Sequence, residues 1–285
     1  MTRQLTYGTA TLMRSEQLTP HLRRIVLDTS TMPDWESSGV PDEALLLVIA
    51  DPKTGAVDLP GEHNGNNFER ARWYTVRRFD LETRELTIDV VGHDVGLATR
   101  WARRALPGDP VGVSSVRTWY DRPDDARWQL LVGDITAVPA IGRIIEEQSE
   151  SIETLVRIEI TDSRDQIEFP AGDNVRVEWV HNSGDSRLDE LVRTAVMSEG
   201  PGYTFAAGEA AATRAVRRHL RHELGQPASR YSVIGYWTAR SEVWNRRLEQ
   251  SGIDLAEIYE AGAAAGKDEE ELADEVDRQL VAAGL

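Results

Sequence analysis

The amino-acid sequence predicts a β barrel joined to an α/β domain. Up to about residue 120, short apolar segments alternate with turn-forming clusters, as in a small antiparallel barrel. After the polar link Tyr120-Asp121-Arg122-Pro123-Asp124-Asp125, strand-like and helix-like segments alternate, which is typical of a doubly wound parallel sheet. We therefore assign residues 1–123 to a six-stranded antiparallel barrel domain, 124–240 to an α/β domain and 241–285 to a helical extension.

The barrel half contains six strand-like segments rich in apolar and β-branched residues. The turns between them are rich in glycine, proline, asparagine and aspartate, which favour chain reversal. One helix interrupts the series at residues 98–106 and stops at Pro107-Gly108-Asp109. The predicted strands cover residues 5–13, 22–27, 44–50, 71–78, 85–91 and 110–113.

The second half alternates buried strands with helices of ten or so residues. Such alternation predicts a parallel sheet covered on both faces, whose ligands lie beyond the carboxyl ends of the strands. The predicted strands cover residues 128–133, 154–161, 174–180, 202–207 and 231–237, and the helices 137–148, 185–196 and 210–223. From Ser241 the chain reads as helix, interrupted near Gly262 to Gly266. This tail could dock on its own chain or on a neighbour, so a monomer and a larger assembly both stay open.

Composition excludes several classes of function. The net charge of −16 argues against nucleic-acid binding, which needs a basic face. The chain has no cysteine, so it holds no disulfide and no thiolate-ligated iron–sulfur cluster. No apolar run reaches the length of about 18 residues that a membrane span needs, and no secretory signal precedes the first strand, so we expect a cytoplasmic protein. The six histidines show no metal-ligand spacing, and no G-x-S-x-G elbow is present.

The segment Arg72-Trp73-Tyr74-Thr75 has the residue types that a flavin site needs on a β-strand. Strand side chains alternate, so Arg72 and Tyr74 should point one way and Trp73 and Thr75 the other. A guanidinium suits a diphosphate, a phenol ring suits a planar isoalloxazine, and Thr75 offers a hydroxyl and an N–H to the flavin N5 edge. The alternative is an edge strand with a solvated arginine face.

A second candidate site follows at Gly96-Leu97-Ala98-Thr99. Small residues at a helix start expose unpaired backbone N–H groups at the positive end of the helix dipole, where a phosphate binds well. Thr99 adds a hydroxyl. The alternative is an ordinary helix start.

The third candidate site lies at the carboxyl ends of the α/β strands. Gly133-Asp134-Ile135-Thr136 enters a helix and could face a pyrophosphate, although Asp134 would resist an anion unless it caps the helix. Arg164 could hold a nucleotide 2′-phosphate or be a solvated loop residue. Gly208 and Glu209 open another helix, with Glu209 as a cap or a ligand contact. Tyr236 and Trp237 end the last strand and could cover a cofactor ring or pack in the core.

Together these residues resemble the siderophore-interacting protein family, flavin-dependent ferric-siderophore reductases of the ferredoxin–NADP reductase superfamily. The resemblance extends over roughly residues 4 to 250, and several motifs follow one another in the order that the family has. The motifs are Leu18-Thr19-Pro20-His21-Leu22-Arg23-Arg24, Arg72-Trp73-Tyr74-Thr75-Val76-Arg77, Gly96-Leu97-Ala98-Thr99-Arg100-Trp101-Ala102, Pro107-Gly108-Asp109, Gly133-Asp134-Ile135-Thr136-Ala137-Val138-Pro139-Ala140-Ile141, Ala207-Gly208-Glu209-Ala210 and Gly235-Tyr236-Trp237.

The resemblance implies a barrel that binds FAD and an α/β domain that binds NADPH. By position, Arg72 would contact the FAD diphosphate, Tyr74 would pack on the isoalloxazine and Thr75 would bond near N5. Residues 96–99 would hold the diphosphate. The nicotinamide nucleotide would face the turn at Gly133, Asp134 and Thr136, together with Gly208 and Glu209.

The implied reaction passes electrons from NADPH through FAD to Fe(III) in a siderophore, which releases Fe(II) for iron assimilation. A ferric chelate is often anionic, so we expect basic residues near the flavin to bind it, with Arg77, Arg78, Arg117 and Arg240 as candidates. NADH and reduced ferredoxin remain alternative donors. The rival functions are a general flavin or ferredoxin-type reductase, and a siderophore-binding protein without catalysis.

Overall fold

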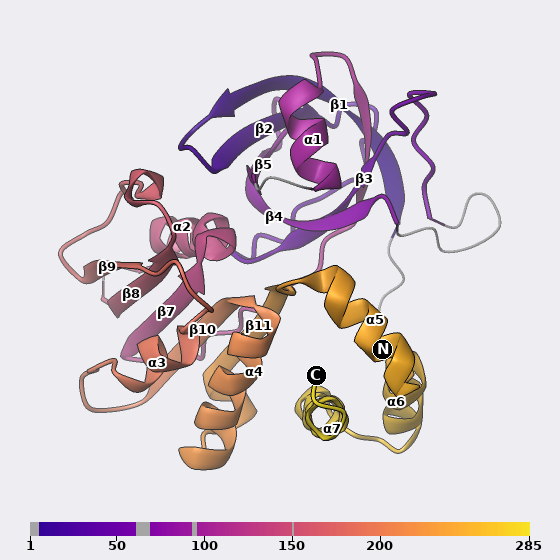
Figure 1. Ribbon diagram of the computed structural model, residues 1–285. Coiled ribbons are helices and arrows are strands. Elements are labelled where there is room, and N and C mark those ends of the chain that lie inside the picture. Colours follow the sequence, from indigo (N-terminus) through magenta and orange to yellow (C-terminus); the bar gives the residue numbers. More distant parts are fainter. Residues whose placement is uncertain (1–5, 61–68, 93–95, 150) are drawn as a thin grey trace.

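The computed structural model describes residues 6–60, 69–92, 96–149 and 151–285. It consists of a barrel, an α/β domain beside it and a helical tail (Figure 1). The barrel and the parallel sheet therefore have the architecture that the sequence predicts. The first predicted strand begins at residue 5, which lies outside the described residues.

The amino-terminal barrel is closed, with its strands hydrogen-bonded in the order β1-β2-β5-β4-β3-β6. All six pairings are antiparallel. Its strands are β1 (Tyr7–Gln17), β2 (Leu22–Asp28), β3 (Ala44–Ile49), β4 (Ala71–Asp80), β5 (Glu85–Val91) and β6 (Pro110–Ser114). Helix α1 (Leu97–Arg104) packs Ala98 and Ala102 into the barrel core. A helix with alanines on its inner face can lie close to the barrel, because these side chains are small.

Strand β1 runs four residues further than predicted. Its continuation, from Arg14 to Gln17, pairs with β2 after a bulge between Leu12 and Arg14. The added residues are polar and exposed. Backbone pairing rather than burial extends the strand, and the apolar pattern therefore could not reveal it.

The α/β domain holds a five-stranded parallel sheet in the order β11-β10-β7-β8-β9. The chain winds outward from β7 in both directions, which leaves a switch point between β7 and β10. Its strands are β7 (Trp128–Asp134), β8 (Glu153–Ile160), β9 (Val175–His181), β10 (Gly202–Glu209) and β11 (Tyr231–Trp237).

Helices cover both faces of this sheet, as the doubly wound fold requires. The short 3-10 turn η1 (Ile135–Ala137) leads into α2 (Val138–Glu147), which packs on one face and lies against β4 of the barrel. Helices α3 (Leu188–Arg193) and α4 (Ala210–Arg218) pack on the other face. In Figure 1 the helix α2 lies between the sheet and the barrel.

Two predicted helices of this domain were too long. The helix predicted for residues 185–196 is only α3, because Glu159 binds the N–H of Arg187 before it and the hydroxyl of Thr194 binds the carbonyl of Glu190 at its end. The helix predicted for residues 210–223 is α4 followed by a π-helical turn, η3 (His219–Glu223). Of these contacts, only the one from Glu159 comes from a distant part of the chain.

The tail forms α5 (Ser241–Ser251), α6 (Leu255–Ala264) and α7 (Glu269–Ala282). The sequence prediction missed the break after α5, where Gly252 has φ +71° and Asp254 caps α6. The interruption predicted near Gly262 to Gly266 is the break between α6 and α7, where Gly266 has φ +76°. Gly262 itself lies inside α6, where a Cβ would meet the Cδ2 of Leu272 on α7 at 2.1 Å. The tail docks on its own α/β domain through pairs such as Arg221 with Asp274.

Buried polar contacts join the barrel to the α/β domain. Arg143 of α2 donates to the Glu43 carboxylate at 2.7 Å and to the Val76 carbonyl at 2.8 Å. The side chains of Arg143 and Glu43 are only 7% and 0% exposed. Elsewhere along the same seam, Thr19 and His21 of the β1–β2 turn donate to Asp165 in η2 (Ser163–Asp165). The relative position of the two domains is therefore fixed by specific bonds.

We expect Arg143→Ala to lower the free energy of unfolding by about 3 kcal/mol, because it leaves the Glu43 carboxylate buried without its cation. Arg187→Ala is the control, since Arg187 pairs with Glu190 at the surface and such pairs contribute little. Urea unfolding of the wild type and both variants measures the difference. Equal effects of the two substitutions would contradict this account of the seam.

Candidate active site

Strand β4 changes its partner half-way along its length. Residues 71–75 pair with β3, whereas the pairs with β5 begin at Val76 opposite Ile88 and continue after a bulge. The last residues of β5, Asp89 to Val91, pair only with β2. Among the residues that the structure describes, no strand pairs with residues 72–75 of β4 on the side of β5, and this stretch is called the opening below.

The side chains of this segment alternate as the sequence predicts. Tyr74 packs against the barrel core, and burial raises the pKa of its phenol although Arg72 acts in the opposite direction. Trp73 lies on the outer face, where its ring contacts Trp119. Thr75 points to that same face and is buried. Arg72 is exposed and donates to the backbone carbonyls of Glu69 and Ala71.

The backbone of Thr75 is turned toward the opening. On β3, Ala44 exchanges two backbone hydrogen bonds with Arg117. The N–H and carbonyl of Ala44 therefore point away from β4. In an antiparallel pair, directly opposite residues either bond to each other or both face away. Thr75 is opposite Ala44, so its N–H and carbonyl face the opening.

The start of α1 lies close to the end of β5. Its cap residue, Gly96, makes no side-chain cap, and the first turn contains no acidic residue. The backbone N–H groups of Leu97 and Ala98 belong to the first turn and have no acceptor within the helix. Thr99 is buried, and its Cγ2 would lie 3.7 Å from a Cβ on Gly92, directly after β5. Helix donors and an open strand edge therefore lie next to each other.

The α/β domain contributes Tyr236 to the same region. Its hydroxyl is buried close to the Thr75 side chain, which acts to lower its pKa, and it has no hydrogen-bond partner of normal geometry in the described part of the chain. Burial raises the pKa of this phenol, and the neighbouring Asp42 and Asp134 carboxylates act in the same direction. A buried donor without a partner is costly, so a ligand acceptor here would stabilise the structure.

These features fit a flavin with a diphosphate. The opening offers a strand N–H at Thr75 and an exposed cation at Arg72, with the Tyr74 ring on the barrel side and the helix N–H groups of Leu97 and Ala98 nearby.

The carboxyl edge of the parallel sheet is less favourable to an anion. Asp134 accepts the N–H and the hydroxyl of Thr136, and its other oxygen accepts the indole N–H of Trp237 at 2.7 Å. Asp134 is therefore a helix cap, as one of the two interpretations of the sequence held. Gly208 has φ +153°, and a Cβ there would meet the Asp134 carboxylate at 2.5 Å. Burial raises the pKa of Asp134, and Glu159 adds to the effect.

Two more carboxylates occupy neighbouring helix starts. Glu209 accepts the N–H of Ala212 in α4 and that of Ala239 after β11. Glu159 accepts the N–H of Arg187 just before α3. Three helix starts at this edge are thus satisfied by the protein's own carboxylates, which occupy the positions that phosphates take in many nucleotide sites. Glu159 is 28 residues from Arg187, so no local pattern in the sequence could show that its carboxylate binds this helix start.

Apart from Arg72, five arginines were predicted to bind the nucleotide or the ferric chelate, and their surroundings differ. Arg164 is exposed and bonds Asp162 through two nitrogens. Arg77 bonds the Glu146 carboxylate on α2, and Arg78 lies 3.7 Å from Asp80. Neither Arg117 nor Arg240 forms an ion pair with any residue that the structure describes, and both are exposed.

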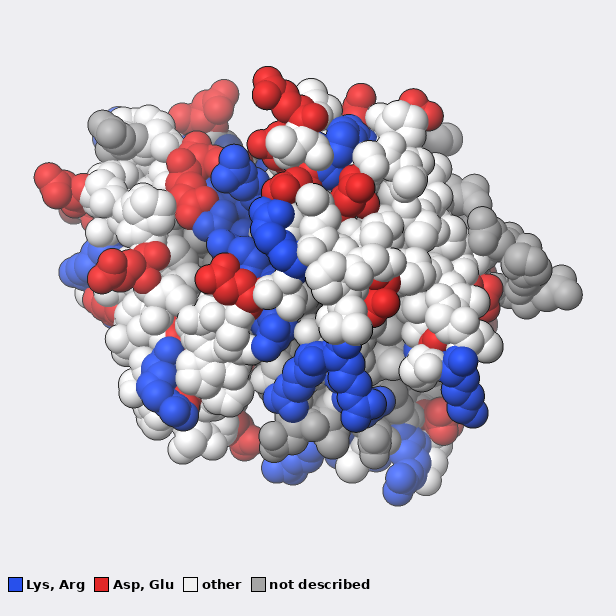
Figure 2. Space-filling view, turned by 90° about the horizontal axis from the view of Figure 1, so that it is seen from above, with Lys and Arg blue, Asp and Glu red and all other residues white. Residues whose placement is uncertain are grey.

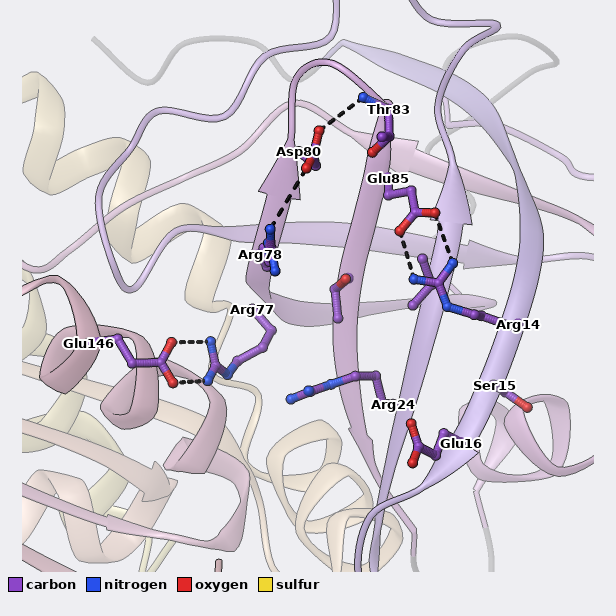
Figure 3. A pocket seen from close by; sticks show the side chains of 12 residues that line it. Arg14, Ser15, Glu16, Arg24, Arg77, Arg78, Asp80, Thr83, Glu85 and Glu146 are labelled. Carbon is purple, nitrogen blue, oxygen red and sulfur yellow. Dashed lines mark hydrogen bonds and ion pairs between the residues drawn. The ribbon is translucent and has the colours of Figure 1, made fainter. Parts of the chain in front are cut away.

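Arg77 and Arg78 line a cavity of about 520 Å³ on the outer side of the barrel. Figure 3 shows Arg77 meeting Glu146, Arg78 near Asp80 and Arg14 meeting Glu85 within it. Its lining includes none of the residues around the opening, and its arginines are neutralised by carboxylates. The face seen in Figure 2 likewise shows both basic and acidic side chains. Of the four substrate candidates, only Arg117 and Arg240 present an uncompensated charge.

The described residues contain no cluster of three or more histidine, cysteine or acidic side chains that could hold a metal ion. No helix among them is long and apolar enough to cross a membrane.

Comparisons with known proteins agree with this geometry. Residues 11–117 match the model of the siderophore-interacting FAD-binding domain, and residues 126–240 match that of the siderophore-interacting protein. A siderophore utilization protein from T. fusca has 30% identity and a TM-score of 0.73, with 83% of this chain and 94% of that chain covered. The chain belongs to the siderophore-interacting protein family. The barrel is thus an FAD-binding domain of that family.

Two further relatives extend the comparison. Ferric vibriobactin reductase ViuB from Vibrio cholerae is 28% identical over 172 residues, which cover 58% of this chain and 64% of that protein. A ferredoxin reductase of carbazole 1,9a-dioxygenase shares the fold at 16% identity, with a TM-score of 0.59 and with 83% of this chain and 71% of that chain covered. The family has the ferredoxin reductase-like fold.

We expect Arg72→Ala to weaken FAD binding about 10- to 100-fold, since a charge-assisted hydrogen bond contributes about 1.5–3 kcal/mol. Arg78→Ala is the matched control, because Arg78 lies on the same strand, is exposed and lines the other cavity. Titration of the flavin-free variants with FAD, followed by flavin fluorescence, gives the two dissociation constants. Unchanged affinity in Arg72→Ala would remove Arg72 from the diphosphate site.

Asp42 should make stability depend on pH. It accepts the N–H groups of Trp119 and Tyr120, and burial raises its pKa to about 6 from 3.8. Between these values the folded state holds a proton that the unfolded state releases, so stability falls as pH rises from about 4 to 6, by about 3 kcal/mol. The Asp42→Asn side chain cannot titrate, so the free energy of unfolding of this variant should not show this fall between pH 4 and 6. Urea unfolding across this pH range tests the difference, and parallel curves for the two proteins would contradict it.

Proposed function

We propose that the protein is an FAD-dependent ferric-siderophore reductase that takes electrons from NADPH. The observation that carries the proposal is the opening in the barrel wall. There the backbone of Thr75 faces the unpaired stretch, Arg72 and Tyr74 lie on the same strand, and the start of α1 lies next to the end of β5, in a chain of this family. The name of ViuB, a ferric vibriobactin reductase, supports the reductase function over simple siderophore binding.

The overall reaction conserves electrons and charge. One NADPH gives up two electrons as hydride and becomes NADP⁺, while two ferric chelates each accept one electron and a proton is released. Bound FAD would supply the link between two-electron and one-electron chemistry. Fe(II) binds the hard oxygen donors of a siderophore less tightly than Fe(III), so reduction releases the iron.

The chain's own groups would bind and orient the reactants. Thr75 would present its N–H at the opening, and Tyr236 would close the α/β side with its buried hydroxyl. Trp237 would be held beside Tyr236 by its bond to Asp134. In this arrangement no side chain needs to transfer a proton to the metal. The contribution of the protein is position and exclusion of water.

NADPH would approach the carboxyl edge of the parallel sheet. The helix starts there already bind Asp134, Glu209 and Glu159, so a pyrophosphate would meet repulsion unless these carboxylates move or take up a proton. Arg164 would hold the 2′-phosphate once it leaves Asp162. NADH and reduced ferredoxin are the alternative donors, and reduced ferredoxin would place no phosphate at this edge.

Anaerobic titration of the FAD-loaded protein tests this function. We expect NADPH to bleach the flavin absorbance, and a ferric chelate then to restore it with two equivalents of iron per flavin. Thr75→Val should slow the bleaching, while Thr83→Val, in the exposed turn after β4, should not. If reduced ferredoxin reduced the flavin and NADPH did not, the proposal that NADPH is the electron donor would be wrong. If the reduced flavin reacted with oxygen but with no ferric chelate, the proposal that a ferric siderophore is the substrate would be wrong.

A further inference from the structure

An aromatic and cationic surface lies on the outer face of the barrel beside the opening. Trp73 of β4 is 42% exposed, which is unusual for so large an apolar side chain. The guanidinium of Arg117 lies 5.5 Å from the centre of the Trp73 ring. Trp119 meets Trp73 edge-on, with ring centres 6.3 Å apart. We call these three side chains the indole platform.

The indole platform is held in place by bonds from several elements. Arg117 exchanges two backbone hydrogen bonds with Ala44 of β3. Asp42 binds the N–H groups of Trp119 and Tyr120, and Ser232 of β11 donates to the Trp119 carbonyl. The backbone of the segment that links the two domains is therefore fixed at this point, which lowers the cost of ordering the platform when a ligand binds.

The charge of Arg117 is available to a ligand. It forms no ion pair with any residue in the described ranges, whereas Arg14, Arg24 and Arg77 on other faces of the barrel each bind a carboxylate. A guanidinium stacked on an indole keeps its N–H groups free at the edge. The platform thus combines exposed aromatic surface with free hydrogen-bond donors.

The platform lies close to the proposed site of electron entry. Ala44 is paired with Arg117 on one side and with Thr75 on the other, so the three residues form one row across neighbouring strands. Two strand spacings separate the backbones of Arg117 and Thr75 by about 10 Å. Trp73 is two residues from Thr75 on the same face. A chelate on the platform would therefore lie at the edge of the flavin opening.

We propose that Trp73, Arg117 and Trp119 select ferric chelates whose iron-binding groups are aryl oxygens, that is, catecholates or phenolates. This inference rests on the proposed function and adds the substrate class to it. Planar electron-rich rings pack against indole edges and faces, and the anionic oxygens of such chelates accept hydrogen bonds from a guanidinium. Hydroxamate chelates have no ring at their donor groups and would use only the charge.

Calorimetric binding to the FAD-loaded protein tests the indole platform. Gallium(III) tris-catecholate and gallium(III) trihydroxamate serve as probes, because gallium(III) is not reduced and binding is then separated from electron transfer. We expect Trp73→Leu to weaken the catecholate about tenfold, since an aromatic pair contributes about 0.5–1.5 kcal/mol, and to leave the hydroxamate within twofold. Tyr259→Leu, at a similarly exposed aromatic residue on α6, is the control.

The FAD content of each variant is checked by absorbance. Trp119→Leu and Arg117→Gln are the second and third variants, which test the platform if Trp73→Leu weakens FAD binding. Both should weaken catecholate more than hydroxamate. Unchanged catecholate affinity in the variants that retain FAD, or equal losses for the two chelates, would overturn the platform. Selective catecholate binding by a protein that never reduces a ferric chelate would overturn the proposed function and leave the platform intact.

Discussion

The site depends on one change of hydrogen-bond partner along β4. If β4 paired with β5 over its whole length, the backbone of Thr75 would be used within the sheet and no cofactor could reach it. Within the described parts of the chain, residues 71–75 pair with β3 alone, which leaves one edge of the strand open while the barrel is closed elsewhere. An unpaired strand edge is normally a liability, so the opening is consistent with a ligand that completes it.

The rest of the structure keeps this opening in a fixed relation to the α/β domain. Arg143 reaches from α2 to Glu43 and to the carbonyl of Val76, the first residue after the open segment. Asp42, the neighbour of Glu43, holds the linker that carries Trp119. The buried charges at the seam thus connect the flavin strand, the domain linker and the helix that follows β7, and they require a single arrangement of the two domains.

Much of this could be predicted from the sequence because the relevant signals are local. The spacing of apolar residues indicated the barrel and the doubly wound sheet. The alternation of side chains along a strand predicted that Trp73 and Thr75 point to one face and Arg72 and Tyr74 to the other. The rest depends on contacts between distant residues. No local pattern shows that Asp42 binds the linker, that Glu159 caps the region before α3, or that Arg77 is neutralised by Glu146. The start of α3 also depends on such a distant contact, from Glu159 to the N–H of Arg187, whereas the break after α5 is marked by local residues, Gly252 and Asp254, that the sequence prediction missed.

The most direct test of the central claim is the exchange rate of single backbone amides, measured by nuclear magnetic resonance with and without FAD. The account predicts that FAD slows exchange of the Thr75 amide about tenfold, because the flavin supplies the acceptor that the strand lacks. The Tyr74 amide, which faces β3, should change little. Equal changes at Tyr74 and Thr75, or no protection of Thr75, would contradict the claim that the flavin completes the open edge of β4.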